Sequence, residues 1–352
     1  MDKTNAHDAT RPAVGVDIKN LYKVFGDQPK KMMPLIAEGI SKDELRDKHH
    51  HILGLRNINL SINPGAIQVI MGLSGSGKST LVRHINRLID PTAGEVWING
   101  KDIIRLNRWA LRRFRREQTA MVFQKFALFP HMTVIENVEF GLRVRGISYK
   151  KRRVTAQHWI ERVGLAGYEH SFPNQLSGGM QQRVGLARAM ANDAPILLMD
   201  EAFSALDPLI RTDMQAVLLD LQQELAKTIV FITHDLDEAL RLGDQVAILR
   251  DGEVVQQGAP QEILLQPADD YVANFVRDVN RGRVIRCRTL VVPGPIVEGP
   301  DLGANLTLEE AARQLGSTGH DQANVIGNKG QHLGSLTIGQ ILAAMVEPSK
   351  AG

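Results

Sequence analysis

Short runs of consecutive apolar residues alternate with longer stretches of helical pattern through the middle of this chain. Apolar runs rich in β-branched residues occur at residues 67–72, 196–200, 228–233 and 245–250. Runs this short that are apolar at nearly every position are typical of parallel strands covered by helices on both faces. We therefore expect an α/β fold built on a doubly wound parallel sheet.

The two ends of the chain show different patterns. Residues 1–15 are expected to be a loose, flexible tail, followed by a short strand and turn at residues 17–25 and an amphipathic helical pattern within residues 29–51. Near the other end, a Pro/Gly-rich stretch precedes two further helical patterns. This organisation predicts a main domain over residues 16–278 and a small α/β module over residues 279–352.

Composition and charge exclude several classes of protein. The chain has 352 residues, with 42 Lys and Arg against 39 Asp and Glu, and a net charge of +3. A balance this close to neutral gives no support to a general nucleic-acid binder. The single cysteine, Cys287, excludes an intrachain disulfide and any metal site made of several cysteines. No stretch approaches the roughly 20 apolar residues that span a membrane, so we expect no spanning segment.

A glycine-rich segment between the first apolar run and a helical pattern carries the clearest chemical signal. Residues 72–80 read GLSGSGKST and fit the pattern G-x-x-x-x-G-K-[ST] in a strand–loop–helix context. The glycines let backbone N–H groups turn toward phosphate oxygens, and the helix adds its positive N-terminal end. Lys78 can reach the β- and γ-phosphates, and the Ser79 hydroxyl can bind Mg²⁺. The residues expected to hold a nucleotide here, which the resemblance described below implies is ATP, are Gly72, Ser74, Gly75, Ser76, Gly77, Lys78, Ser79 and Thr80.

An acidic pair follows the second apolar run directly. Asp200 and Glu201 end the segment ILLMDE, at the carboxyl end of a predicted strand. A carboxylate beside a phosphate loop can supply an oxygen for Mg²⁺, and its neighbour can polarise an attacking water. We therefore assign Asp200 to the metal and Glu201 to the water. Upstream, residues 176–179 (LSGG) form a second Ser/Gly turn that opens a helical pattern, and so a second candidate anion site.

Taken in order, six segments of the chain resemble the ATP-binding subunits of ABC transporters. The segments are GLSGSGKST, MVFQ, LSGGMQQR, ILLMDE, SALD and THD, and LSGG is the most discriminating of them. The resemblance covers about residues 15–275 and implies an ABC ATPase domain, a P-loop NTPase, with a helical subdomain at about residues 125–190. More narrowly, LIAEGISKDEL, IMGLSGSGKST, MDEAFSALDPLIR and THDLDEAL resemble the subfamily that energises uptake of glycine betaine, proline betaine or choline.

The resemblance implies roles for residues at matching positions. It implies that Gln124 senses Mg²⁺ and the attacking water, that Glu201 is the general base, and that His234 contacts the γ-phosphate. It implies that Ser79, Gln124 and Asp200 hold the metal. In a dimer, ATP held by one subunit would meet residues of the other subunit, namely Ser177, Gly178, Gly179, Gln181 and Asp207.

Two further assignments follow from the resemblance. For each, the alternative is that the residues belong to the ordinary hydrophobic core. An aromatic is expected to stack on adenine near the first strand, with Phe25 as the first choice and Tyr22 as the second. The segment 126–134 is expected to form the groove that receives a short helix of a membrane permease. Its expected docking residues are Phe126, Leu128, Phe129 and Pro130.

The C-terminal segment resembles a single CBS repeat. Residues 307–346 are expected to form a helix, a strand, a turn, a strand and a helix opened by Thr337. Relatives with such tails usually carry two repeats, and here residues 283–292 are at most a remnant of the other. Ligand binding, pairing with a repeat from a second subunit and a purely structural role all stay open.

Three polar runs are discounted as functional sites. The run His49–His51 has no neighbouring cysteine, and consecutive side chains point in different directions, which disfavours a metal site. The basic stretches 105–116 and 150–153 are expected to be solvated helix faces, since neither lies in a basic domain with interleaved aromatics.

The function implied by the resemblance is that of a motor subunit. It would hydrolyse ATP with Mg²⁺ as a dimer, on the cytoplasmic face of the inner (plasma) membrane, and drive separate transmembrane permease subunits, with a separate substrate-binding protein as an indirect partner. The expected cargo is a quaternary ammonium compound. Histidine or another amino-acid derivative is an alternative cargo. A soluble ABC-type ATPase and a P-loop kinase are alternatives of other classes, and the segments LSGG and SALD disfavour the kinase.

Overall fold

The computed structural model describes residues 13–277 and 279–346, so most of the tail expected at residues 1–15 lies outside the described part. The chain divides into two compact units. One comprises Met1–Asp235 with Leu242–Gln257, and the other Leu236–Arg241 with Gly258–Gly352. The division after Gln257 lies earlier in the chain than the boundary at residue 278 that the sequence suggested.

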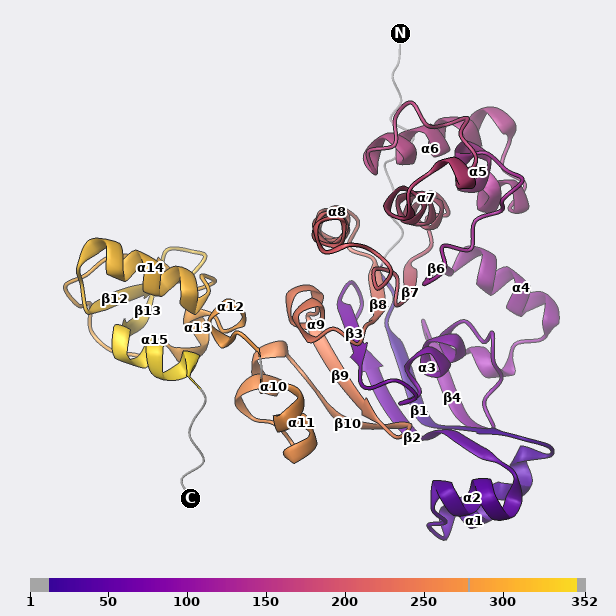
Figure 1. The fold of residues 1–352 in the computed structure, drawn as a ribbon, viewed down its shortest axis with the longest axis horizontal. Coiled ribbons are helices and arrows are strands. Elements are labelled where there is room, and N and C mark those ends of the chain that lie inside the picture. Colours follow the sequence, from indigo (N-terminus) through magenta and orange to yellow (C-terminus); the bar gives the residue numbers. More distant parts are fainter. Residues whose placement is uncertain (1–12, 278, 347–352) are drawn as a thin grey trace. The chain divides into compact units, whose positions relative to one another are not determined.

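A six-stranded sheet forms the centre of the first unit (Figure 1). Its strand order is β10-β9-β3-β8-β7-β6, and the pairs from β9 to β6 are parallel. All residues of β3, β7 and β8 are buried, which is the covered parallel sheet that the apolar runs predict. The strands are β3 (Ile67–Met71), β6 (Thr119–Phe123), β7 (Ile196–Asp200), β8 (Thr228–Ile232), β9 (Gln245–Arg250) and β10 (Glu253–Gly258).

A second, antiparallel sheet in the same unit was not expected from the sequence. Its order is β2-β1-β4-β5. The pairing of β1 shifts register at several positions, which interrupts the simple alternation by which strands are recognised. The short strand expected at residues 17–25 is thus a full strand of this sheet. The strands are β1 (Val16–Phe25), β2 (Ile52–Ile62), β4 (Ala93–Ile98) and β5 (Lys101–Asp102).

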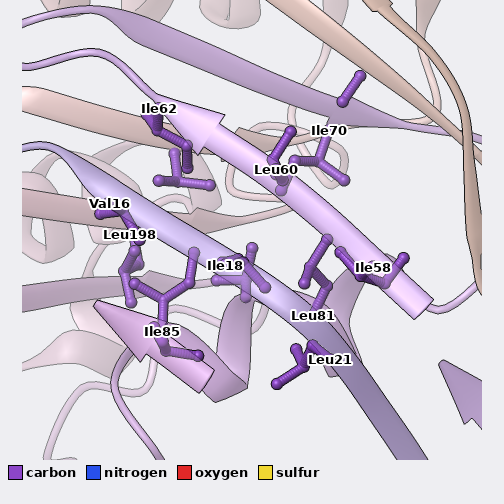
Figure 2. Packing of buried hydrophobic residues seen from close by; sticks show 14 of the residues in the cluster. Val16, Ile18, Leu21, Ile58, Leu60, Ile62, Ile70, Leu81, Ile85 and Leu198 are labelled. Atoms are coloured by element: carbon purple, nitrogen blue, oxygen red, sulfur yellow. The ribbon is translucent and has the colours of Figure 1, made fainter. Parts of the chain in front are cut away.

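The helix that follows the phosphate loop, α3 (Lys78–Ile85), is held between the two sheets. Figure 2 shows its buried Leu81 and Ile85 among side chains of β1 and β2, with Leu198 of β7 close to Ile85. Because this core surrounds α3, the phosphate loop is anchored at both of its ends.

Three helices make up the expected helical subdomain. They are α5 (Val134–Val144), α6 (Tyr149–Arg162) and α7 (Gly178–Ala191), which pack on one another and gather at one end of the unit in Figure 1. The interpretation of residues 150–153 as a solvated face is wrong in part. Arg152 and Arg153 are largely covered and lie 3.4 and 3.6 Å from the buried carboxylate of Glu139. The other helices here are η2 (Ile103–Arg105), α4 (Arg108–Glu117), η3 (Pro173–Gln175) and α8 (Pro208–Leu225).

The amphipathic pattern at residues 29–51 forms three short helices. They are η1 (Pro29–Met32), α1 (Met33–Ala37) and α2 (Lys42–His49). Ser41 lies between α1 and α2 and caps the start of α2, since its hydroxyl accepts a hydrogen bond from the Glu44 N–H at 3.1 Å. Ile36 and Leu45 form a small core with residues of β1 and β2, so this segment has its own buried face.

The second unit carries a three-stranded sheet in the order β11-β12-β13. Its last elements follow the expected order of helix, strand, strand and helix, and the hydroxyl of Thr337 caps the last helix. Residues 283–292 contain short helical turns rather than a strand. The elements are α9 (Leu236–Leu242), α10 (Pro260–Leu265), α11 (Asp270–Phe275), α12 (Arg281–Val284), α13 (Cys287–Leu290), β11 (Asp301–Gly303), α14 (Leu308–Thr318), β12 (Gln322–Ile326), β13 (His332–Thr337) and α15 (Ile338–Met345).

Within residues 13–277 and 279–346, none of the helices combines the length and the apolar character that crossing a membrane requires.

Candidate functional site

The phosphate loop joins β3 to α3 and encloses the ammonium group of Lys78. The Lys78 Nζ donates to the carbonyl oxygens of Gly72 at 2.8 Å and Leu73 at 2.9 Å, and the residue is only 5% exposed. Burial lowers the pKa of Lys78, whereas the nearby carboxylates of Glu201 and Asp200 raise it. A cation therefore lies in the loop where phosphate oxygens would need it.

The loop is exposed at its tip and closely packed at its base. Ser74 and Gly75 are exposed, and Ser76 is buried. At the base, Gly77 has a φ of 102°, and a Cβ there would lie 2.8 Å from the carbonyl oxygen of Gly54. A residue other than glycine would have to adopt the left-handed region and displace β2. The carbonyl of Thr80, in the first turn of α3, faces Nδ1 of His84 at 2.7 Å.

The structure brings the predicted metal ligands Ser79 and Asp200 together. The Ser79 hydroxyl donates to Asp200 Oδ1 at 2.7 Å, and the carboxylate is almost fully buried at the end of β7. Arg83, which the sequence reasoning missed, donates to Asp200 Oδ2 at 3.2 Å. Arg83 lies one turn beyond Ser79 on α3, so helical spacing could have indicated it. Hydroxyl and carboxylate oxygens are ligands that Mg²⁺ prefers, so the residues present fit this metal.

The predicted catalytic residues converge on the carboxylate of Glu201. Glu201 Oε2 accepts a hydrogen bond from Gln124 Nε2 at 3.0 Å and lies 3.8 Å from His234 Nδ1. Ser204, which the sequence reasoning also missed, donates to the Glu201 carbonyl at 2.9 Å and accepts from Gln124 at 3.3 Å. Glu201 has a φ of 47°, a conformation that costs free energy for a non-glycine residue. The Ser204 hydrogen bond helps to hold that conformation.

The segment LSGG, residues 176–179, forms a turn at the start of α7 that we call the signature turn. The Ser177 hydroxyl accepts from the Met180 N–H at 3.3 Å, and the Gln181 amide donates to the Leu176 carbonyl at 3.2 Å. The hydrogen bonds found for these two side chains in the described residues thus stay within their own turn. Ser177 and Gly178 are exposed.

Asp207 lies beside the signature turn at the start of α8. Its carboxylate caps this helix by accepting from the Ile210 N–H at 3.0 Å, and the residue is exposed. Ile210 also limits the space at Gly179, where a Cβ would lie 2.6 Å from Ile210 Cγ2. The structure therefore places Gly179 against the first turn of α8, the helix that Asp207 caps.

Of the two candidate aromatics, the structure favours Phe25. Phe25 ends β1 with 38% of its surface exposed, and its ring lies where a Cβ on Gly54 would approach it to 2.7 Å. Since Gly54 also packs against Gly77, Phe25 lies close to the phosphate loop. Tyr22 instead packs against the small core of residues 29–51, as the alternative of ordinary core packing predicts.

A cavity of about 360 Å³ adjoins the predicted docking segment. Phe129 lines it together with Phe140, whose ring centroid is 4.4 Å away. Phe126 turns toward the signature turn, where a Cβ on Gly178 would lie 3.7 Å from its ring. Of the four predicted docking residues, Phe126, Leu128, Phe129 and Pro130, only Phe129 lines this cavity.

Three features define a P-loop ATPase here. They are the phosphate loop, the buried Asp200 bonded to the serine of that loop, and Glu201, whose carboxylate is contacted by residues of two other loops. Comparisons with known proteins narrow this class. The sequence profile of the ABC transporter family matches residues 55–204. The chain is 48% identical over 338 residues to the glycine betaine/proline betaine transport system ATP-binding protein ProV of Escherichia coli, covering 95% of this chain and 84% of the relative.

Two other relatives cover much of the chain. The trimethylamine N-oxide transport system ATP-binding protein TmoW of Ruegeria pomeroyi is 45% identical over 321 residues, 91% of this chain and 94% of the relative. The dimeric structure of a post-hydrolysis state of the ATP-binding cassette MJ0796, bound to ADP and Pi, matches 70% of this chain and 98% of its own, with a TM-score of 0.59 and 36% identity. The chain belongs to the family of ABC transporter ATP-binding proteins, which are ATPases coupled to transport.

Proposed function

We propose that this chain is the motor subunit of an ABC importer for quaternary ammonium compounds such as glycine betaine, proline betaine or choline. The observation that carries the cargo assignment is the 48% identity, over 95% of the chain, to a glycine betaine/proline betaine transport protein. The 45% identity to a trimethylamine N-oxide transport protein favours a second candidate cargo. Both classes of cargo have a nitrogen that carries no hydrogen.

In the proposed mechanism, the chain accelerates hydrolysis by positioning ATP and the attacking water more than by covalent chemistry of its own. Ser79, Gln124 and Asp200 would hold Mg²⁺, which supplies positive charge to the β- and γ-phosphates. Glu201 would accept the proton of the water. The hydrogen bond from Gln124 to the Glu201 carboxylate, at 3.0 Å, supports this role because it fixes the direction of the base. His234 would donate to the γ-phosphate.

We propose that the working unit is a dimer in which the signature turn and Asp207 of one copy complete the ATP site of the other. Two observations support this. The signature turn is exposed and bonded within itself, and the similar ATP-binding cassette was solved as a dimer. ATP would then close the dimer and its hydrolysis would reopen it.

The dimer would act on separate transmembrane permease subunits from the cytoplasmic face of the membrane, with a substrate-binding protein as an indirect partner. The permease would dock at Phe126, Leu128, Phe129 and Pro130. The cavity beside Phe129 supports that place. We further propose a main domain over residues 16–278 and a single CBS-like module over residues 279–352, which the order of α14, β12, β13 and α15 supports.

The test is reconstitution in vesicles of this chain with its cognate permease and binding protein. The rate of ATP hydrolysis is measured against added glycine betaine, choline, trimethylamine N-oxide and histidine, with Glu201→Gln as the inactive control. Stimulation by glycine betaine or choline supports the main proposal. Stimulation by trimethylamine N-oxide alone favours the second cargo, and stimulation by histidine alone overturns both cargo assignments while retaining the motor.

A further inference from the structure

Residues 26–51 leave the antiparallel sheet at the end of β1 and return at the start of β2, and the two ends of this segment meet at His51. The Nε2 of His51 lies 2.6 Å from the carbonyl oxygen of Asp27, and its Nδ1 lies 2.5 Å from that of His49. The residue is 8% exposed. Both partners are acceptors, so a ring nitrogen that carries a hydrogen can donate to one of them. Because Asp27 lies near the start of the segment and His51 at its end, the contact at Nε2 joins the two ends.

The helices between these two ends pack onto the antiparallel sheet. Ile36 and Leu45 are buried against Val24 of β1 and Leu53 of β2. A guanidinium nitrogen of Arg56, also on β2, donates to the Ile40 carbonyl at 2.7 Å. These contacts fix the helices of the segment on the two strands from which it leaves and to which it returns.

A continuous series of contacts leads from His51 to the phosphate loop. Gly26 packs on the imidazole so closely that a Cβ there would lie 2.4 Å from His51 Cδ2, and its φ of 137° suits glycine. Phe25 directly precedes Gly26, and its ring covers Gly54. The carbonyl of Gly54 in turn faces Gly77 of the phosphate loop. The position of the Phe25 ring therefore depends on the turn that His51 holds.

We propose that His51 closes residues 26–51 into a clasp, and that this clasp positions Phe25 to stack on the adenine of ATP. This inference rests on the proposed role of Phe25. His51 is a positioning residue, because it touches the backbone at both ends of the segment and acts through Phe25. Fixing a half-exposed ring before ATP arrives lowers the conformational entropy that is lost when adenine stacks on it.

The test measures the dissociation constants of the full chain for ATP and for inorganic triphosphate, which has no base. His51→Leu keeps the bulk of the side chain but removes both ring nitrogens that face the carbonyls. We expect roughly a threefold to tenfold weaker affinity for ATP and an unchanged affinity for triphosphate. His51→Gln, which keeps a donor, should recover part of the loss. The matched control is His50→Asn, since His50 is exposed and its φ of 56° is one that Asn tolerates.

Two further variants separate this inference from the role of Phe25. Phe25→Ala should weaken ATP binding selectively, and the double variant with His51→Leu should be no weaker than Phe25→Ala alone. If Phe25→Ala leaves ATP affinity unchanged, the stacking role fails and the clasp fails with it. If Phe25→Ala acts but His51→Leu does not, or if their effects add, the clasp alone is overturned. Should His51→Leu not fold, Gly26→Ala would place a Cβ 2.4 Å from His51 Cδ2 and so displace the imidazole, and it must give the same selective loss of ATP affinity.

Discussion

The phosphate loop and the signature turn are both Ser/Gly segments that open a helix, yet they differ in their partners. Ser79 bonds to the buried Asp200 at the end of β7, and Lys78 is covered by its own loop. Ser177 is exposed and caps its own helix. The phosphate loop is completed by a residue of its own chain, whereas the signature turn is exposed and bonded within itself. This difference supports the proposal of a site divided between two copies, which the predictions below test.

The largest effect is expected at the half of the ATP site that one chain completes by itself, which contains Glu201. Glu201→Gln removes the base but retains the shape of the side chain. ATP hydrolysis should fall by about 100-fold to 10,000-fold, because this is the usual contribution of a general base. Phosphate release measures the rate, and ATP binding by the same variant should persist. Hydrolysis close to that of the unaltered chain would remove Glu201 from the catalytic role.

The divided site predicts complementation between two inactive variants. Lys78→Ala should strongly weaken ATP binding, and Ser177→Arg should retain it, while each lowers hydrolysis by at least about 100-fold. In a mixed dimer, one site combines the intact phosphate loop of the second variant with the intact signature turn of the first. The mixture should therefore hydrolyse ATP well above either variant alone. A mixture no more active than its parts would contradict a site shared between copies.

Acid should destabilise the first unit through the helix of the phosphate loop. Burial lowers the pKa of His84 on α3 from 6.5 to about 4, whereas the fully buried side chains of α7 are uncharged. The unfolded chain binds a proton at this residue near pH 6.5 and the folded chain does not. The stability from neutral His84 is thus complete above pH 6.5 and declines as the pH falls toward 4. The decline from pH 7 to pH 5 should be about 2 kcal/mol.

Urea unfolding of the full chain and of His84→Gln at both pH values measures this decline. The variant should lose less stability on acidification than the unaltered chain by about the same 2 kcal/mol. Equal losses in the two proteins would show that His84 does not titrate in this range.

The smallest effect is expected from the serine that supports the base. Ser204→Ala removes the donor to the Glu201 carbonyl and the acceptor for Gln124. The kcat should fall by roughly threefold to tenfold with the KM for ATP unchanged, because these hydrogen bonds orient Glu201 and do not touch the nucleotide. Ser204→Thr keeps the hydroxyl and serves as the control. A change confined to KM would contradict this positioning role.

Local sequence patterns predicted the elements whose information lies in consecutive residues. The phosphate loop at residues 72–80, the buried strands β3, β7, β8 and β9, and the start of α7 all occur where the pattern indicated. Resemblance to a family supplied roles for Gln124, Glu201 and His234, and the structure brings these three together. The antiparallel sheet was missed because its strands change register and alternate irregularly.

Residues whose partners lie far along the chain were assigned wrongly or overlooked. Arg152 and Arg153 belong to a charged stretch, but they face the buried Glu139 once α6 packs on α5. The roles of Arg83 and His51 likewise depend on their partners, which are Asp200 for Arg83 and the Asp27 carbonyl for His51. Such pairings depend on which elements become neighbours, and the spacing of residues along one element does not contain that information.

The sequence by itself determined the class of this protein, because a phosphate loop is built from the backbone and side chains of adjacent residues. The tertiary structure decided the geometry of the catalytic site. The sheet order places β7 between β8 and β6, so the ends of these strands bring Glu201, His234 and Gln124 to one edge. Sheet order and register follow from the packing of the whole core, and a linear pattern of apolar residues is compatible with several such orders.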